Sequence, residues 1–563
     1  MEKFIETRDK AGKISTMRTP CQGDDLLQIP ELNKGSAFSL DERRRFGLMG
    51  KLPISIETSE QQVARFYKQY SQYETDIEKN LFLNQLKQHN QTIFYQLTAK
   101  YLDEMMPIIY TPTIGDAVEQ FSYQFNQPQG LFLSYEYQEH LDEILDQVNL
   151  KEVDIALVTD GEGVLGIGDW GTGGVDICIG KLMVYTLCGG IDPNRVLPVQ
   201  LDVGTNNQSL INDPMYLGWR HERITGEKYD AFIDKVVNAL VRRYPQTYIH
   251  WEDFGRDNAH RVLNNYRDKH TSFNDDIQGT GATATACVLS ALKAAKAGLS
   301  EQKFVFLGAG TAGTGVADQL CHALVRSGIE EEDARRQFWM VDRDGLITTD
   351  MDGITDAQTL YARSELDHRG WTLDKVVDEV KPTVLIGCST VKGAFTESIV
   401  KSMAQHVEHP IIFPLSNPTS LSEATPADLI RWTEGKVIVA TGSPFDPVDH
   451  DGDLIRISQC NNAFVFPGLG LGVLVAKAKQ VTDNMIAASS DALSDYSPAR
   501  KDSSAPVLPS FDHIHEISQY IAHKVVEQAI KDGVHGCDKA MNIQEAIQAQ
   551  FWLPHYYDYE LIE

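Results

Sequence analysis

The first long periodic stretch of the chain has the hydrophobic spacing of a helix. From Thr58 onward, apolar residues recur at steps of three and four, which places them on one helical face. They are Val63, Phe66, Tyr67, Tyr70, Ile77 and Leu81. Thr58 and Gln61 have the spacing of a capping box at the first turn. A second helical run covers residues 87–105, and we predict an N-terminal helical domain over residues 1–126.

From residue 127 the pattern changes to short apolar runs that alternate with helical segments, which is typical of an α/β layer. Val153–Thr159 predicts a strand, Asp160–Gly163 a tight turn and Val164–Asp169 a returning strand. A helix is expected to begin at Gly180. The apolar run that ends at Trp251 begins another unit of strand, helix and strand. We predict a second domain, of α/β type, over residues 127–276.

A dinucleotide fingerprint opens the third part of the chain. Gly308, Gly310 and Gly313 form G-x-G-x-x-G directly after an apolar strand and at the start of a helix, the context that this motif requires. Asp342 ends the strand FWMVD, 34 residues after Gly308, where about 20 is typical. A carboxylate there accepts hydrogen bonds from ribose hydroxyls and favours NAD over NADP, although the neighbouring Arg343 weakens that preference. We predict an NAD-binding Rossmann domain over residues 277–459.

Three further apolar strands end in small polar residues. Because ligands lie outside the carboxyl ends of strands in an open parallel sheet, one crevice should be lined by Ser389, Thr390, Asn417 and Thr441. A second glycine-rich turn, PGLGLG, follows Asn461 and Asn462. No strand-helix-strand unit follows this turn, so close helix packing is favoured over phosphate binding. The predicted fold is therefore α/β, with a Rossmann-type NAD domain, an α/β substrate domain and an N-terminal helical domain.

Charge and cysteine usage narrow the classes of partner and compartment. A net charge of -28 over 563 residues argues against nucleic acid or an anionic membrane surface as the main partner. No run of 18 apolar residues predicts a membrane span. The eight cysteines lie apart without C-x-x-C spacing, as expected of buried thiols in a reducing cytosol. We expect a cytoplasmic protein.

Two acidic clusters flank the helix of the strand-helix-strand unit whose first apolar run ends at Trp251. Glu252 and Asp253 close one strand, and Asp275 and Asp276 follow Phe273. Grouped carboxylates repel one another unless a cation lies between them, and hard divalent ions prefer such oxygen ligands. The alternative is two unrelated acidic loop edges. The second cluster leads directly into a Gly/Ala/Thr-rich helix start, which favours a metal site.

Lys181 and Tyr110 are candidates for proton transfer. Lys181 interrupts the apolar run Ile177–Leu187, so it either extends its ammonium group to water or sits desolvated with a lowered pKa. A position near a helix N-terminus would also disfavour the ammonium form. In the desolvated case the amine can act as a general base. Tyr110 ends an apolar segment beside two proline-containing steps, which suits a hydroxyl at a cleft edge; the alternative is a core tyrosine.

Six ordered motifs resemble the malic enzyme superfamily over nearly the whole chain. They are YTPTIGD, DGEGVLGIGDWG with GKLMVYT, HWEDFGR, FNDDIQGTG, LSNPT and CNNAFVFPG. The resemblance implies oxidation of L-malate at C2 by NAD, metal-assisted loss of CO2 and an enolpyruvate intermediate. It also implies that residues 127–276 are the substrate and metal domain, and that residues 460–563 return to this domain before a helical tail.

When the family's residue roles are carried over position by position, the resemblance implies a role for each candidate residue. Lys181 matches the base that takes the C2 hydroxyl proton, and Tyr110 the acid that protonates the enol carbon. The positions that match the Mn²⁺ or Mg²⁺ ligands are Glu252, Asp253 and Asp276, with Asp275 as a supporting residue. Nicotinamide and substrate contacts fall at Asn417 and Asn462, with Asn461 and Gly163 as further substrate positions.

Gly163 is a departure from the family pattern. Typical malic enzymes have an arginine after the glutamate of DGE, where it engages a malate carboxylate. The segments EGVLGIGDWG and GAGTAG resemble malolactic enzymes more than ordinary malic enzymes. Malolactic enzymes convert L-malate to L-lactate and CO2 with NAD as a bound, recycled hydride carrier. We therefore expect a malolactic enzyme.

Two alternatives to a malolactic enzyme stay open. LDVGTNN and INDPMYLGWRHERITGEKYDAF also resemble bacterial NAD-dependent malic enzymes, which release pyruvate, CO2 and NADH. A non-catalytic NAD-binding regulatory protein is a remote alternative, because it would not need a lysine, a tyrosine and three carboxylates together. The resemblance further implies a homodimer or homotetramer.

Overall fold

The structure is a computed structural model that describes residues 3–9, 12–164, 166–365, 368–502 and 504–562. The chain divides into two compact units. Unit 1 comprises Met1–Asp160, Trp170–Thr247 and Ala540–Glu563, and unit 2 comprises Gly161–Asp169 and Tyr248–Lys539. The division into four domains expected from the sequence stays a prediction.

A layer of helices forms much of unit 1, as the hydrophobic spacing predicts. It consists of α3 (Ser59–Tyr70), α4 (Asp76–His89), α5 (Gln91–Lys100), α6 (Leu102–Ile109) and α7 (Thr113–Gln124). The capping box is confirmed: Gln61 N donates to Thr58 Oγ1 at 3.3 Å, and Thr58 N donates to Gln61 Oε1 at 2.9 Å. Local sequence therefore determines where α3 begins.

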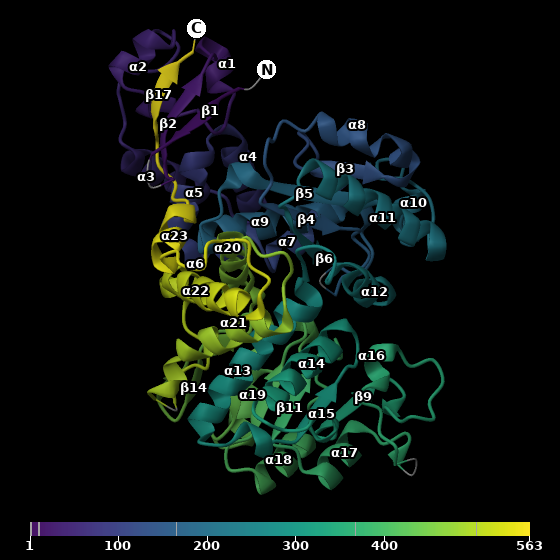
Figure 1. Ribbon diagram of the computed structural model, residues 1–563. Helices are drawn as coiled ribbons and strands as arrows, with labels where there is room; N and C mark the ends of the chain where they lie inside the picture. Colours follow the sequence, from purple (N-terminus) through teal and green to yellow (C-terminus); the bar gives the residue numbers. More distant parts are fainter. Residues whose placement is uncertain (1–2, 10–11, 165, 366–367, 503, 563) are drawn as a thin grey trace. The chain divides into compact units, whose positions relative to one another are not determined.

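The two ends of the chain form one small sheet in unit 1. Its strands are β1 (Ile5–Arg8), β2 (Ile14–Thr19) and β17 (Asp558–Leu561), and β17 runs parallel to β2. Figure 1 shows β17, the C-terminal strand, beside β2. Helices α1 (Gly23–Leu27) and α2 (Leu40–Arg45) follow β2, and Phe38 and Phe46 pack edge-on against Tyr559. The sequence analysis predicted a helical tail and missed this strand, because its partner lies more than 500 residues away.

A parallel sheet of order β3-β5-β4 forms the α/β part of unit 1. Its strands are β3 (Leu131–Ser134), β5 (Val196–Asp202) and β4 (Ile155–Thr159). Its helices are α8 (Leu141–Asp146), α9 (Val175–Gly189), α10 (Gln208–Asn212) and α11 (Gly226–Arg243), of which α9 packs on β4 and β5. The expectation that a helix begins at Gly180 is wrong, because α9 already begins at Val175. Lys181 therefore lies beyond the first turn, where the helix N-terminus has little effect.

The predicted returning strand Val164–Asp169 is also wrong. Val164 and residues 166–169 form a tight loop closed by a bridge between Val164 and Gly168, and Leu165 lies outside the described residues. Gly166 and Gly168 adopt φ angles of 76° and 90°, which turn the chain away from strand geometry. This loop belongs to unit 2.

The longer segment of unit 2 begins with the predicted strand, helix and strand. These are β6 (Tyr248–Glu252), α12 (Arg256–Tyr266) and β7 (Ser272–Asn274), and β6 pairs with β7 in parallel. A π-helical turn at Asp275–Gly279 then leads into α13 (Thr280–Ala295). Both acidic clusters consequently follow the carboxyl ends of neighbouring strands.

A seven-stranded sheet of order β10-β9-β8-β11-β12-β13-β16 forms the nucleotide-binding part of unit 2. The strands are β8 (Phe304–Leu307), β9 (Phe338–Asp342), β10 (Gly345–Leu346), β11 (Val384–Gly387), β12 (Ile411–Pro414), β13 (Ile438–Thr441) and β16 (Ser458–Gln459). The connecting helices are α14 (Thr311–Arg326), α15 (Glu331–Arg335), α16 (Asp356–Thr359), α17 (Leu373–Val380), α18 (Glu397–His406) and α19 (Pro426–Trp432). Strand order reverses between β8 and β11, as in a Rossmann fold. A hairpin of β14 (Val448–His450) and β15 (Asp453–Ile455) precedes β16.

The last helices of unit 2 pack closely, as the glycine-rich turn predicts. They are α20 (Phe466–Ala476), α21 (Asp483–Asp495) and α22 (Ile514–Asp532), while α23 (Ile543–Gln550) belongs to unit 1. A Cβ on Gly468 would lie 2.8 Å from Ile521 Cβ, and one on Gly472 would lie 2.7 Å from Val525 Cβ. These glycines therefore let α20 approach α22. In the described part of the chain, every helix is too short or too polar to cross a membrane.

Candidate active site

Three carboxylates meet at the carboxyl ends of β6 and β7 in unit 2. One oxygen each from Glu252, Asp253 and Asp276 lies within 4.8 Å of the others. Glu252 and Asp253 are each only 1% exposed, and Asp253 N donates to Asp276 Oδ2 at 2.8 Å. Buried like charges this close repel strongly without a cation. The donor set consists of oxygens alone, which fits a hard divalent ion such as Mn²⁺ or Mg²⁺.

His250 is a neighbour of this cluster that the sequence analysis missed. Its ring nitrogen lies within 4.8 Å of ligand atoms of Glu252 and Asp275, and Nε2 is 3.5 Å from Glu252 Oε2. Residues two apart on a strand share one face, so the spacing of His250 and Glu252 could have indicated this pair. Asp275 is fully buried, consistent with a supporting position.

Asn462 contacts the same acidic turn. Its Nδ2 donates to Asp275 Oδ2 at 3.0 Å and to Thr280 Oγ1 at 3.0 Å. The side chain of Asn461 instead caps its own turn, where its Oδ1 accepts a hydrogen bond from Ala463 N at 2.9 Å. Of the two asparagines, the structure therefore links Asn462 to the carboxylate cluster.

The loop that carries Gly163 packs on the turn that follows β6 and contains Asp253, a candidate metal ligand. Gly163 N donates to Asp253 O at 2.9 Å, and Asn258 Nδ2 donates to Glu162 Oε2 at 2.9 Å. A Cβ on Gly163 would lie 2.8 Å from Phe254 O, closer than ordinary van der Waals contact. The backbone therefore leaves no room for an arginine at this position as it stands.

Unit 1 holds the two candidates for proton transfer. Lys181 is 2% exposed within α9, so the alternative in which its ammonium extends to water does not hold. Tyr110 is buried at the end of α6. A Cβ on Gly180 would lie 2.9 Å from Ile109 O, so α9 approaches the end of α6 closely at these two residues. They directly precede Lys181 and Tyr110.

The three fingerprint glycines of unit 2 occupy distinct environments. Gly308 has φ +97°, and a Cβ there would lie 2.4 Å from Cys388 O. A Cβ on Gly313 would lie 2.1 Å from Gly308 O, whereas one on Gly310 meets no atom within 4 Å. The first glycine thus serves the turn, the third allows close packing, and the second leaves open space where a pyrophosphate can approach.

Asp342 is positioned at the end of β9 by a glutamine that the sequence analysis did not single out. Gln358 Nε2 donates to Ala309 O at 2.9 Å and lies 3.5 Å from Asp342 Oδ2. Asp342 Oδ1 accepts a hydrogen bond from Arg343 N at 2.9 Å. Gln358 therefore connects the predicted ribose acceptor to the fingerprint loop.

A buried carboxylate, Glu423, organises the other strand ends and was also missed. Ser389 donates to Glu423 Oε1 from both N and Oγ at 2.8 Å, and Ser416 Oγ donates to the same oxygen at 2.5 Å. Glu423 stands alone among small polar residues in the sequence, so no local pattern marks it. The position of Ser389 is thus fixed by two hydrogen bonds to this carboxylate.

The strand ends of β12 and β13 meet through Ser443. Its Oγ donates to Asn417 Oδ1 at 2.5 Å, and its carbonyl accepts from Thr441 Oγ1 at 2.8 Å. A Cβ on Gly166 would lie 2.8 Å from Asn417 O. The structure therefore brings Asn417 and Thr441 together, next to the loop that also carries Gly163.

Two family models match the chain, and close relatives cover nearly all of it. Residues 87–267 match the family model described as "Malic enzyme, N-terminal domain", and residues 277–530 match "Malic enzyme, NAD binding domain". The chain is 47% identical over 551 residues to NAD-dependent malic enzyme 3 of Bacillus subtilis, covering 96% of this chain and 97% of that one. It is 48% identical over 547 residues to the NAD-dependent malic enzyme of Sodalis glossinidius, with coverages of 96% and 97%.

Solved structures share the fold at lower identity. The malic enzyme of Entamoeba histolytica superposes with a TM-score of 0.57 at 23% identity, covering 89% of each chain. That of Pyrococcus horikoshii gives a TM-score of 0.54 at 21% identity, covering 80% of this chain and 88% of the other. The α/β fold with a Rossmann domain is thus confirmed.

Proposed function

Because the chain belongs to the malic enzyme family, we propose that it oxidises and decarboxylates L-malate to pyruvate and CO2 with reduction of NAD⁺ to NADH. The observation that carries this proposal is the presence, in one unit, of a three-carboxylate cluster and a complete dinucleotide fingerprint. A hard cation and a nicotinamide cofactor together suit oxidation of a hydroxy acid followed by loss of a carboxylate.

The product is the point on which the sequence analysis and the relatives differ. The resemblance at Gly163 favours lactate, whereas the relatives at 46–48% identity are named NAD-dependent malic enzymes, which favours pyruvate. These names also leave the non-catalytic alternative without support. We therefore place pyruvate first.

The proposed mechanism assigns proton transfers to unit 1 residues. The Lys181 amine takes the proton of the C2 hydroxyl while the C2 hydride leaves, which turns C2 into a carbonyl carbon. After the C4 carboxylate departs as CO2, the Tyr110 hydroxyl donates a proton to C3 of the enol and gives pyruvate. Their burial excludes bulk water, which strengthens proton transfer between fixed groups.

Unit 2 residues bind and orient the reacting groups. Glu252, Asp253 and Asp276 would hold a divalent ion, and such an ion would supply Lewis acidity for the oxidation and decarboxylation of malate. NAD⁺ supplies the hydride acceptor. Asn417 and Asn462 would orient nicotinamide and substrate, and Asp342 would accept hydrogen bonds from a ribose.

Malolactic activity is a second candidate because of Gly163. The close contact with Phe254 O leaves no place for the arginine that engages a malate carboxylate in typical malic enzymes. Altered binding of malate and pyruvate could retain pyruvate until the same NADH reduces it to lactate. That cycle consumes no net NAD⁺.

One assay separates the two products. L-malate and Mn²⁺ are incubated with NAD⁺ in amounts well below the malate, and lactate, pyruvate and NADH are measured. Pyruvate equal to NADH supports the malic enzyme assignment, and lactate far beyond the NAD⁺ supplied establishes the malolactic one. Absence of all three products with intact NAD binding would refute both. Sedimentation of the same sample tests the proposed homodimer or homotetramer.

A further inference from the structure

Glu423 is a fully buried carboxylate at the strand ends of unit 2. Its Oε1 accepts hydrogen bonds from Ser389 N and Ser389 Oγ, both at 2.8 Å, and from Ser416 Oγ at 2.5 Å. Its Oε2 accepts a longer one from Ser416 N at 3.4 Å. One buried side chain thus connects the residues that follow β11 with those that follow β12.

The directions of these hydrogen bonds indicate that Glu423 is ionised. Ser389 Oγ accepts a hydrogen bond from Val391 N at 3.2 Å, and Ser416 Oγ accepts one from Thr390 N at 2.8 Å. Each hydroxyl therefore directs its own hydrogen toward Glu423. The backbone N–H groups of Ser389 and Ser416 can only donate. All four partners of the carboxyl group are thus donors, and an ionised carboxylate is the form that only accepts.

The charge of Glu423 lacks a cationic partner among the described residues. No lysine, arginine or histidine of the described ranges forms an ion pair or a hydrogen bond with its carboxylate. Removing a carboxylate from water without a counter-charge is costly, and hydrogen bonds from neutral donors offset only part of that cost. A cationic group that binds at these strand ends would therefore be stabilised by Glu423.

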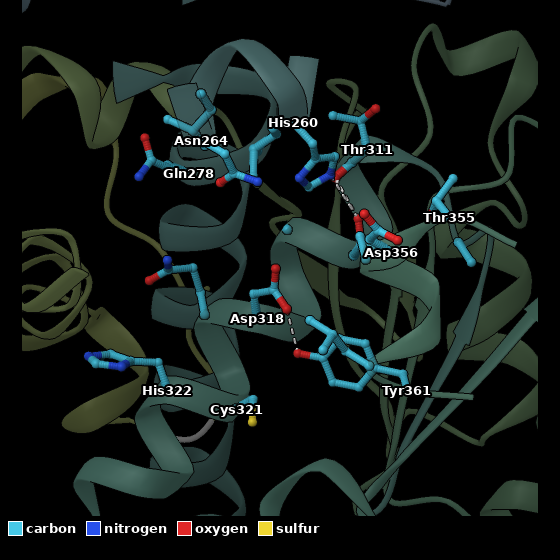
Figure 2. Close-up of a pocket in the computed structure, with 18 of the residues that line it drawn as sticks. His260, Asn264, Gln278, Thr311, Asp318, Cys321, His322, Thr355, Asp356 and Tyr361 are labelled. Carbon is cyan, nitrogen blue, oxygen red and sulfur yellow. Dashed lines mark hydrogen bonds between the residues drawn. The ribbon is translucent and has the colours of Figure 1, made fainter. Parts of the chain in front are cut away.

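Asp318, a second carboxylate of the same unit, has a different environment. It lines a groove of about 810 Å³ along α14, and Figure 2 shows its carboxylate facing the hydroxyl of Tyr361. That hydroxyl donates to Asp318 Oδ1 at 2.6 Å. Burial raises the pKa of Asp318 to about 6, and the nearby charges of Arg335 and Arg267 oppose that rise. Glu423 does not line this groove, so the two carboxylates can be tested separately.

The residues that Glu423 holds adjoin the proposed cofactor site. A Cβ on Gly308, the first fingerprint glycine, would lie 2.8 Å from Ser389 Cα, so the end of β11 contacts the fingerprint turn. Asn417, the proposed nicotinamide contact, directly follows Ser416. Because Glu423 is itself 0% exposed, it acts on a ligand there through its charge and not by contact.

We propose that the charge of Glu423 makes the site bind NAD⁺ in preference to NADH. This inference rests on the NAD dependence proposed above. The nicotinamide ring of NAD⁺ carries a positive charge, and it loses that charge when it takes a hydride, two electrons with one proton, from C2 of malate. A buried carboxylate therefore stabilises the oxidised ring and has no matching effect on the reduced ring. Weaker binding of NADH promotes its release, which agrees with pyruvate as the proposed product.

The test compares Glu423→Gln with the wild-type full chain at pH 8. Glutamine is nearly the same size as glutamate and still accepts hydrogen bonds, but it carries no charge. Dissociation constants for NAD⁺ and NADH are measured calorimetrically without malate, and thermal unfolding checks that the variant folds. Loss of one partly screened charge should weaken NAD⁺ binding about 10-fold and leave NADH binding nearly unchanged. Such a tenfold change in the ratio of the two constants equals about 30 mV in the reduction potential of the bound couple.

Two further variants separate the effect of the charge from that of the structure. Glu423→Asp keeps the charge on a shorter side chain, so the ratio of the two dissociation constants should stay near that of wild type even if both affinities fall. Asp318→Asn is the matched control, because it removes a carboxylate that is ionised at pH 8 and lies in the groove along α14. It should leave the ratio unchanged.

Three outcomes would contradict these expectations. An equal loss of NAD⁺ and NADH affinity in Glu423→Gln would leave Glu423 with a structural role alone and overturn the proposal, as would unchanged affinity for both. If Glu423→Gln does not fold, the wild type supplies the measurement: NAD⁺ should bind more tightly than NADH, and the reverse order would overturn the proposal. A wild-type chain that binds neither form of the cofactor would instead refute the proposed function.

Discussion

The contact between Gly163 and the turn after β6 makes a quantitative prediction. In Gly163→Ala, the new Cβ would lie 2.8 Å from Phe254 O, and relief to ordinary contact requires a shift of about 0.6 Å. Overpacking of this kind costs about 1–3 kcal/mol. Because Gly163 N also donates to Asp253 O, the shift is passed to a proposed metal ligand. We expect lower stability and about 10-fold weaker Mn²⁺ binding, the lower end of what loss of a supporting contact produces.

Two measurements and one control test this prediction. Thermal unfolding and calorimetric Mn²⁺ titration are compared for wild type, Gly163→Ala and Gly115→Ala. A Cβ on Gly115 meets no atom within 4 Å and lies in α7, so that variant should be stabilised by up to about 1 kcal/mol with unchanged Mn²⁺ affinity. Wild-type stability and Mn²⁺ affinity in Gly163→Ala would show that the loop has room for a side chain. The argument that Gly163 excludes an arginine would then fail.

Three further predictions concern single side chains. Lys181→Ala should abolish malate conversion and leave the dissociation constant of NAD⁺ largely unchanged; malate turnover at the wild-type rate would remove the lysine from the mechanism. Asp276→Asn keeps an acceptor for Asp253 N but loses a charge, so calorimetry should show Mn²⁺ binding weakened at least about 10-fold, and equal affinity would exclude Asp276 as a ligand. Burial raises the pKa of Asp318 from 3.8 to about 6, so the folded chain binds more protons than the unfolded chain between these values. The free energy of unfolding therefore decreases by about 3 kcal/mol as the pH rises from 3.8 to about 6. Asp318→Asn, which still accepts the Tyr361 hydroxyl, should unfold at a higher temperature than wild type at pH 8 and show no advantage near pH 4; the same difference at both pH values would contradict this account.

Helix and strand positions with strong local signals followed from the sequence. The capping box at Thr58, the strand, helix and strand around α12, and the fingerprint glycines all appear where the pattern predicts them. Each depends on residues a few positions apart, so the local sequence contains the needed information. The start of α9 and the strand at Val164–Asp169 were misjudged, because the glycines in these segments permit several backbone conformations.

Residues that act through distant partners were not found from the sequence. The missed residues are His250, Glu423 and Gln358, which meet Asp275, Ser389 and Asp342 only in the folded chain. Neither a lone glutamate nor a lone glutamine has a pattern that distinguishes it from a solvated residue. Their partners lie tens of residues away, so register and sheet order determine the contacts.

The sequence by itself determined the fold class, the order of the motifs and the chemical identity of the candidate groups, since these depend on residue type and short-range spacing. Only the tertiary structure decided that Lys181 is buried, that the carboxylates of Glu252, Asp253 and Asp276 converge, and that Gly163 lies against Phe254 O. Burial, convergence and close approach arise from packing between segments far apart in the chain, and no local pattern encodes them.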